Sequence, residues 1–523
     1  MVLTAFNQIN VISVSSIEKE NENFIIIPGW GICHYSIIGI CGMCKFAEAC
    51  VLSIILVVVP LLACDLSLPT GQAIAVHAVL TFGMVIGAFL FGAIIDAYGR
   101  KRSISLTLIV IFCSTITLSF AQAPFLINLS LFVLGTGLAG NDVVLKVYLI
   151  ELLPMKQRGS SLAVLDIFGI IGYIAALGFS WLLMPSILHF QDNKFRPNSW
   201  RILAGIGGVP NLIMACAVSL LPASPRYMLY RQRQEETLAI LQQMYAINTS
   251  KHANTYPVRQ FYINNSSLLI LYKINFDNCV RSDEWNEIEK NGIFKTIEIF
   301  CLKTYKRVGN IFETPFARIT ILAIIISCLQ FPGLAWFALW KTQLLEGMEN
   351  LDKSKENNCT IDIQNMVMGF LHNCQEINID RFELLLYLSL SYILAEILLV
   401  IGIDSVGRKI FLVFSGLIGA ATCLALVFTV HHVMQLVLSM TTLATYAICN
   451  TSTTILILEN YFTGIRGTAI GFTRILPHFL DFFTKLFLNV HCFHSIFFVS
   501  GMLLSVAVVG LQMPDLTRLP MQE

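Results

Sequence analysis

The stretch that decides the fold reads Gly92-Ala-Ile-Ile-Asp96-Ala-Tyr-Gly99-Arg100-Lys101-Arg102, and it lies between two apolar runs, 72–95 and 103–122. A shorter copy, Asp404-Ser-Val-Gly407-Arg408-Lys409, also lies between apolar runs, 308 residues later (404 − 96 = 308). A basic turn between two apolar runs is typical of paired membrane helices, because about 20 apolar residues cross a bilayer. We expect glycine in each turn because it bends the backbone without a Cβ clash.

A second motif repeats in the same register. Glu151 is followed seven residues later by Arg158-Gly159, and Glu459 by Arg466-Gly467, again 308 residues apart (459 − 151 = 308). Two independent motifs in one register indicate two copies of one unit. The segments beginning at Pro222 and Pro514 are also alike, but they are 292 residues apart (514 − 222 = 292), so the second copy is 16 residues shorter (308 − 292 = 16) and its eleventh helix is the least secure span.

The composition indicates a chain that lies mostly in lipid. Of its 523 residues, 56% are hydrophobic and only 13% are charged, whereas soluble domains carry about 25% charged residues. The net charge of +1 gives no sign of an acidic partner. Twelve runs are long enough to span, namely 36–60, 72–95, 103–122, 126–150, 160–184, 202–221, 317–340, 384–403, 410–429, 433–458, 467–490 and 494–512.

Lysine and arginine in short loops set the orientation of a membrane protein, since such loops stay in the cytoplasm. The basic loops 96–102, 151–159 and 404–409 all fall on one side, which we predict to be cytoplasmic, together with both termini. The expected organisation is a cytoplasmic segment 1–32, a six-helix bundle 33–222, a cytoplasmic linker with surface helices 223–316, a second six-helix bundle 317–513 and a cytoplasmic tail 514–523.

These motifs carry a resemblance, together with Cys64-Asp-Leu, Trp200-Arg201, Pro222-Ala-Ser-Pro225-Arg226 and Met244-Tyr-Ala-Ile-Asn248-Thr. The chain resembles major facilitator superfamily transporters of the sugar/organic-cation type, and among them the synaptic vesicle glycoprotein 2-like group, over roughly 34–260 and 310–518. The resemblance implies an all-α integral membrane fold of twelve transmembrane helices in two pseudo-symmetric six-helix bundles. It also implies a cytoplasmic gating role for Asp96, Arg100, Glu151, Arg158, Asp404, Arg408, Glu459 and Arg466. Two departures weaken this pattern: Ala223 stands where the family usually has Glu, and Val400 is the counterpart of Gly92.

Charges inside the spans are candidates for contact with a solute or a proton. Lys45 and Glu48 are three residues apart in the first span, and Asp142 and Lys146 are four apart in the fourth, so each pair shares a helix face. A charge at a helix centre costs about 2.5–3.5 kcal/mol, so these side chains should face water or each other. By resemblance both helices line the central cavity, and we favour Glu48 as the contacting carboxylate. The alternative is that each pair is purely structural, which we favour for Asp142 and Lys146.

Other polar residues in the spans leave their roles open. Asp166 and Glu396 are single carboxylates that either carry a proton or lie on a wet face. A polar stripe on the eleventh helix either faces the cavity or marks a malformed helix, and it consists of Arg474, His478, Asp481 and Lys485.

The predicted outer loop 341–382 carries two modification candidates. Cys359 and Cys374 are either disulfide-bonded or two free thiols. Asn358-Cys-Thr360 is a glycosylation sequon on the outer side, whereas we discount the sequon at Asn248 because it is predicted to be cytoplasmic.

The sequence therefore predicts a secondary active transporter that moves a small solute, an organic ion or a sugar, by alternating access. Proton coupling through Glu48 is a hypothesis. No nucleotide-binding loop, catalytic triad or metal-ligand spacing occurs, so we expect no enzyme activity, no cofactor and no metal. The expected partners are a small solute and the lipid bilayer, with no nucleic acid, and the chain is expected to be a monomer in the plasma membrane or an intracellular vesicle. The alternatives are a transporter-like vesicle glycoprotein with a binding or trafficking role, and a channel, which the absence of a filter-like loop disfavours.

Overall fold

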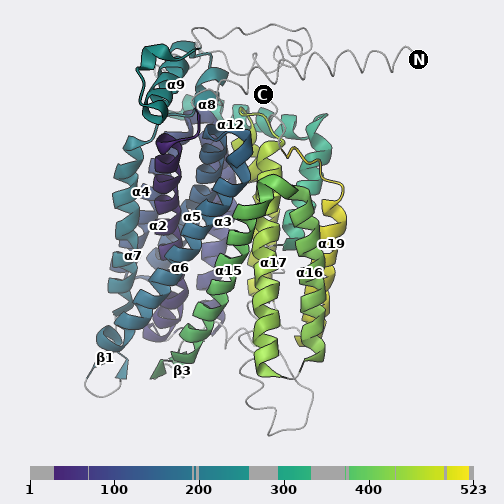
Figure 1. Ribbon diagram of the computed structural model, residues 1–523. Coiled ribbons are helices and arrows are strands. Elements are labelled where there is room, and N and C mark those ends of the chain that lie inside the picture. Colours follow the sequence, from purple (N-terminus) through teal and green to yellow (C-terminus); the bar gives the residue numbers. More distant parts are fainter. Residues whose placement is uncertain are drawn as a thin grey trace.

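The computed structural model describes residues 29–66, 68, 70–190, 194–195, 199–257, 293–330, 371–372, 376–377, 379–429, 431–487 and 492–517. Its long helices form two groups that lie side by side (Figure 1). The first group consists of α2 (Ile32–Asp65), α3 (Thr70–Tyr98), α4 (Arg100–Phe120), α5 (Pro124–Leu152), α6 (Arg158–Leu188) and α7 (Ser199–Ala217).

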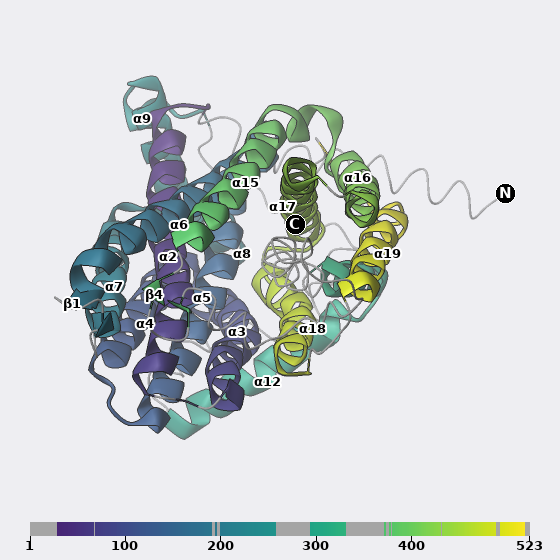
Figure 2. The same cartoon turned by 90° about the horizontal axis from the view of Figure 1, so that it is seen from below.

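The second group follows the linker. It consists of a helix over Phe316–Gln330, α15 (Ile379–Val406), α16 (Arg408–Phe428), α17 (His432–Glu459), α18 (Arg466–Phe487) and α19 (Cys492–Gly510). The two groups meet where α3 packs along α18 and α6 packs along α15 (Figure 2). These two helix pairs are related by the 308-residue repeat, so the same contact is made twice.

Nine helices in the described part of the chain are long and apolar enough to cross a membrane, and a bent pair, Ile297–Ile311 with Phe316–Gln330, would make ten. Helix α18 is not among them, and its sequence carries Arg466, Arg474, Asp481 and Lys485. The seventh expected span, 317–340, is described only as far as Gln330.

The linker places short helices over one end of the bundle, at the top of Figure 1. They are α8 (Pro225–Tyr230), α9 (Gln234–Thr249) and α12 (Ile293–Ile311), with a 3-10 turn at Ala253–Thr255. Two further 3-10 turns, Met155–Gln157 and Val218–Leu220, lie before the linker. The Asn248 side chain accepts a hydrogen bond from the Cys33 backbone N–H at 3.0 Å, so α9 caps the first turn of α2. Asn248 is thus part of a structural contact.

Two short hairpins lie at the opposite end of the bundle (Figure 1). Strand β1 (His189–Phe190) pairs antiparallel with β2 (Lys194–Phe195), and β3 (Leu371–His372) with β4 (Glu376–Ile377). Cys64, near this end of α2, is disulfide-bonded. The predicted glycosylation site Asn358 and the candidate disulfide Cys359–Cys374 fall outside the described residues.

The two basic turns are built by glycine, as expected. Gly99 has φ 96° and caps the start of α4, and Gly407 has φ 121° and caps the start of α16. Residues with a Cβ rarely adopt these angles. The sharp turn at each glycine places the next residue, Arg100 or Arg408, next to the last turn of the preceding helix, α3 or α15.

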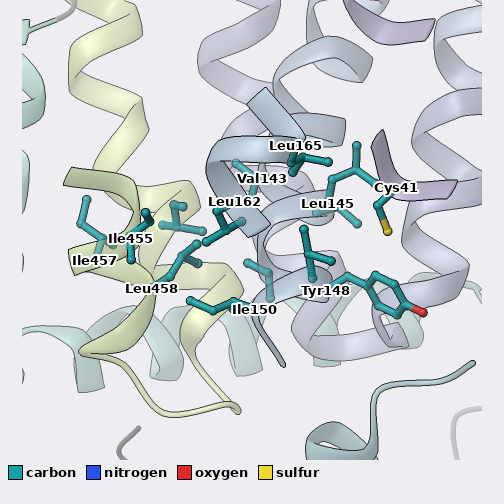
Figure 3. Close-up of a cluster of buried hydrophobic side chains, with 14 of the residues drawn as sticks. Cys41, Val143, Leu145, Tyr148, Ile150, Leu162, Leu165, Ile455, Ile457 and Leu458 are labelled. Carbon is teal, nitrogen blue, oxygen red and sulfur yellow. The ribbon is translucent and has the colours of Figure 1, made fainter. Parts of the chain in front are cut away.

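An apolar cluster joins the two groups just inside the linker end. Cys41, Tyr148 and Leu162 from the first group and Ile455 and Leu458 from α17 belong to one buried cluster (Figure 3). Such a cluster excludes water between the groups while they are in contact. It also marks the surface that would have to part if the groups moved against each other.

Candidate functional site

Eight charged residues lie together at the linker end of the bundle, and we call them the charged rim. Its members are Asp96, Arg100, Glu151, Arg158, Asp404, Arg408, Glu459 and Arg466. They are the eight residues for which the family resemblance implies a gating role. Seven are buried and Asp404 is half-buried, so their charges must be met by partners rather than by water.

Each half of the rim sends an aspartate across to cap a helix of the other half. Asp96 at the end of α3 accepts hydrogen bonds from the backbone N–H groups of Gly467, at 3.2 Å, and Thr468, at 2.7 Å, in the first turn of α18. Asp404 at the end of α15 accepts from Gly159, at 3.0 Å, and Ser160, at 2.8 Å, in the first turn of α6. A carboxylate is favoured there because free N–H groups and the helix dipole both attract negative charge.

Glu151 is the hub of the first half. Arg100 donates to both of its oxygens, from Nε at 2.9 Å and from Nη2 at 2.8 Å. Arg466 from the other group donates to Oε1 at 3.2 Å, and the Ser224 hydroxyl donates to Oε2 at 2.6 Å. Arg100 also reaches across to the carbonyl oxygen of Thr463. Glu151 is the closer anion of Arg100, since Asp96 Oδ1 is 3.5 Å from Nη2.

The second half repeats this arrangement with fewer contacts to its glutamate. Arg408 Nη2 donates to Glu459 Oε1 at 3.1 Å and to Asp404 Oδ1 at 2.9 Å. Glu459 Oε2 has no hydrogen-bond partner among the described residues. Arg158, the counterpart of Arg466, interacts electrostatically with Glu459. The rim is therefore a two-fold repeated set of contacts between the groups.

The linker seals the rim from outside. Tyr227 of α8 lies under the Arg100 guanidinium, whose Cζ is 4.0 Å from the ring centroid. Arg231 donates to the Ala97 carbonyl oxygen at 2.6 Å. The Tyr230 ring lies directly against Gly464, where an added Cβ would come within 2.5 Å of it. The linker therefore holds the ends of α3 and α18 together.

Small residues let the rim close tightly. A Cβ at Gly92 would lie 2.4 Å from the Gly467 carbonyl oxygen, and one at Gly471 would lie 2.4 Å from that of Ala88. Glycines four residues apart allow close helix contact in membranes. At the repeated contact between α6 and α15, the counterparts of Gly92 and Gly471 are Val400 and Ala163.

The two ion pairs predicted in the spans form one network. Lys45 Nζ contacts Glu48 Oε1 at 2.7 Å and Asp142 Oδ1 at 2.6 Å, and Lys146 Nζ contacts the same Asp142 oxygen at 3.0 Å. Asn141 donates to Glu48 Oε2 at 2.8 Å, so both oxygens of Glu48 are bonded. The Asp142 side chain is 28% exposed and Glu48 only 8%, so Asp142 is the member open to solvent.

The network continues to the single carboxylates of the other spans. Lys146 Nζ is 3.4 Å from Asp166 Oδ1 on α6. The Thr451 hydroxyl on α17 lies 3.1 Å from Asp166 Oδ2 and 2.8 Å from Glu396 Oε1 on α15. Charges that look isolated in the sequence are thus linked from α2 to α15 across the boundary between the groups.

The polar stripe on α18 is placed in part. Arg474 is buried and donates to Asn450 Oδ1 at 3.2 Å and to Thr454 Oγ1 at 2.6 Å, both on α17. It faces the interior of the bundle rather than lipid, and its charge acts on Asp142 and Asp166. The side chain of Lys485 lies outside the described residues.

Sequence reasoning missed the neutral groups of the site. Thr468 and Ser160 offer backbone N–H groups, while Ser224, Asn141 and Thr451 offer side-chain hydrogen bonds. Asn141, adjacent to Asp142 in the fourth span, is a polar residue that could have been singled out. Thr451 has no signal in the sequence, because it lies in the run Thr451-Ser-Thr-Thr454 and only the fold selects one of its hydroxyls.

Comparisons with known proteins agree with this architecture. Residues 34–259 match the family model described as "Sugar (and other) transporter". The organic cation/carnitine transporter 7 of Arabidopsis thaliana is 26% identical over 230 residues, which is 44% of each chain. Synaptic vesicle glycoprotein 2C of Rattus norvegicus is 26% identical over 251 residues, which is 47% of this chain and 34% of that protein. The chain thus matches less than half the length of these relatives.

Solved structures match almost the whole chain at low identity. A proton:xylose symporter of the major facilitator superfamily, XylE, superposes with a TM-score of 0.64 at 14% identity, over 93% of this chain and 97% of that one. FucP, a major facilitator superfamily transporter solved in the outward conformation, gives 0.57 at 12% identity, over 92% and 100%. At such identities the likeness shows the fold alone, and it confirms the expected all-α membrane fold.

Proposed function

We propose that this chain, whose residues 34–259 match the "Sugar (and other) transporter" family model, is a member of that family and a secondary active transporter that moves a small solute, an organic ion or a sugar, by alternating access. The observation that carries the proposal is the charged rim. Its contacts between the groups are hydrogen bonds and ion pairs next to the two glycine turns, which can break and re-form as units when the apolar cluster beside them parts. Opening the rim would expose the network of Lys45, Glu48, Asp142 and Lys146.

The four charges of this network are the proposed contacts for the solute. Asp142 is the most exposed member and holds both lysines, so a solute that displaces one lysine from Asp142 would free a charge of either sign. This arrangement suits a polar or charged solute and does not select between a sugar and an organic ion. The Lys45–Glu48 ion pair would then contact the other side of the solute.

The proposed orientation places the charged rim in the cytoplasm, with both termini on that side. The basic loops of the sequence favour it. The disulfide of Cys64 supports it as well, because Cys64 lies at the far end of α2 from the rim and disulfides persist in oxidising compartments. The proposed domain division remains two bundles, 33–222 and 317–513, joined by a cytoplasmic linker, in a monomer of the plasma membrane or a vesicle.

A solute screen in proteoliposomes tests the proposal. The full chain would be reconstituted and offered labelled sugars, organic cations and organic anions, with counterflow as the readout. We expect uptake of at least one class, and at least a tenfold loss with Asp142→Asn. The matched control is Glu235→Gln, which changes an exposed carboxylate on α9 and should leave uptake unchanged.

The outcome against the proposal is a folded, reconstituted protein that moves none of these solutes. That result, combined with specific binding of a vesicle protein, would support the alternative role in binding or trafficking. The relative named synaptic vesicle glycoprotein 2C is the observation that keeps this alternative open.

A further inference from the structure

We propose that Glu396 and Asp166 share a bound proton through the Thr451 hydroxyl, and that this site on the boundary between the two groups is where a proton couples to opening of the rim. The inference rests on the transport function proposed above and names its coupling ion. It moves the coupling site away from Glu48, both of whose oxygens are already bonded to Lys45 and Asn141.

The Thr451 hydroxyl has two carboxyl neighbours but only one hydrogen. It lies 2.8 Å from Glu396 Oε1 and 3.1 Å from Asp166 Oδ2, and it contacts no other acceptor among the described residues. A hydroxyl has one hydrogen, and a linear hydrogen bond aims it at only one of these oxygens. If both carboxyl groups were ionised, Thr451 would donate to one carboxylate, and a lone pair of its oxygen would face the other carboxylate. The arrangement that gives both contacts a linear hydrogen bond is one in which one of the two carboxyl groups carries a hydrogen and donates it to the Thr451 oxygen.

The surroundings decide which carboxyl group holds the proton. Asp166 Oδ1 is 3.4 Å from Lys146 Nζ, so its charge is met, and Arg474 also acts on it. Glu396 is 2% exposed, makes no ion pair among the described residues, and its Oε2 has no hydrogen-bond partner there. An unpaired buried carboxylate is disfavoured by several kcal/mol. Glu396 is therefore the protonated partner while the rim is closed.

In the part of the chain that the structure describes, Lys146 is the cation that acts on Glu396. Helix α6 contributes Asp166, and Tyr392, one turn away from Glu396 on α15, lies near Tyr173 of α6 and Tyr446 of α17. On α16 the described charges are Arg408 and Lys409, both at the rim. A metal cation is disfavoured because the site offers only two carboxyl groups and one hydroxyl, and Lys146 already occupies one side.

The position of the site links the proton to movement. Asp166, Glu396 and Thr451 each lie eight residues from a rim member (166 − 158 = 8, 404 − 396 = 8, 459 − 451 = 8), which is about 12 Å along a helix. Asp166 belongs to the first group, whereas Glu396 and Thr451 belong to the second. Opening the rim would withdraw Asp166 and admit water to Glu396, which would then ionise and release its proton on the rim side.

The reverse step reloads the site from the more exposed side. The Asp166 side chain is 14% exposed, so a proton can reach it from the network side while the rim is closed. Asp166 then passes this proton to the Thr451 oxygen while Thr451 gives its own hydrogen to Glu396. One proton moves, the hydroxyl is restored, and Asp166 returns to its pair with Lys146.

Infrared spectroscopy of the reconstituted full chain tests the site without any solute. At neutral pH we expect a protonated-carboxyl C=O band that shifts in deuterium oxide, that is lost in Glu396→Gln and that is retained in Glu48→Gln. The amide of Glu396→Gln can still donate to Thr451, so the variant should fold. If it does not, Thr451→Val should shift the frequency of the band by removing its acceptor.

Each other outcome overturns the site: no such band in the wild type, a band unchanged in Glu396→Gln, a band unchanged in Thr451→Val, a band lost in Glu48→Gln, or a band removed when sodium replaces choline in the buffer. The infrared test and the solute screen can give a negative result independently of each other. A band without transport of any solute would sink the proposed function alone, and transport without a band would sink the proton site alone.

Discussion

At the scale of single residues, Glu151 concentrates the contacts of the charged rim. It accepts two hydrogen bonds from Arg100, one from Arg466 and one from Ser224, and it is fully buried. Its repeat counterpart Glu459 is equally buried but has one oxygen without a partner among the described residues. The two-fold repeat is therefore unequal at its hubs, and the first half holds the rim more firmly.

We expect Glu151→Gln to destabilise the protein by about 3–5 kcal/mol, because it removes the closer anion of the buried Arg100 and leaves only Asp96 at 3.5 Å. The free energy of unfolding in detergent, measured by denaturant titration, checks this. Glu459→Gln is the matched control. It should lower the free energy of unfolding clearly less, because Glu459 accepts a hydrogen bond from Arg408 through only one of its two carboxylate oxygens. If the two variants lost the same free energy of unfolding, the conclusion that Glu151 stabilises the rim more than Glu459 would be wrong.

At the scale of elements, the contact between α3 and α18 is set by backbone proximity. The Gly467 carbonyl oxygen occupies the space that a Cβ on Gly92 would need, at 2.4 Å. Because the obstructing atom belongs to a helix backbone, a side chain at position 92 can be accommodated only by moving one helix away from the other.

We therefore expect Gly92→Val, which installs the residue found at its counterpart Val400, to lower stability by about 1–3 kcal/mol. The midpoint of thermal unfolding is the measurement. The same change at Gly178 on α6 is the control, since an added Cβ there meets nothing within 4 Å. A Gly92→Val protein as stable as the Gly178→Val protein would show that α3 and α18 are not in close contact.

The same elements show how far the sequence reaches. The 308-residue offset pairs Asp96 with Asp404 and Glu151 with Glu459, and the turns follow from Gly99 and Gly407, because repeats and glycine geometry are local signals. The sequence does not predict that Asp96 caps α18, since nothing in a repeat says which half a carboxylate faces. Nor does it join Lys45 to Asp142, which lie on different helices. Spacing identifies pairs within a helix, whereas pairs between helices depend on packing.

At the scale of the whole molecule, both caps cross the boundary between the groups, and the helices that they cap belong to different groups. Asp96 holds α18, and Asp404 holds α6. If the groups rock as rigid bodies, one opening event must break both caps, so weakening either one should raise the population in which both are open. Hydrogen exchange of the capped amides, Gly467 and Thr468 on one side and Gly159 and Ser160 on the other, reports each cap separately.

We expect Asp96→Asn to speed exchange at Gly159 and Ser160 as well as at Gly467 and Thr468, although the substitution touches only the second pair. A charge-assisted hydrogen bond contributes about 1.5–3 kcal/mol, so the increase should be about tenfold or more at both caps. Asp404→Asn should give the mirror result, and the double variant should multiply the two increases, because distant sites act additively in free energy. Faster exchange confined to the substituted cap would mean that each cap frays alone, and a concerted rocking of the two groups would then have to be abandoned.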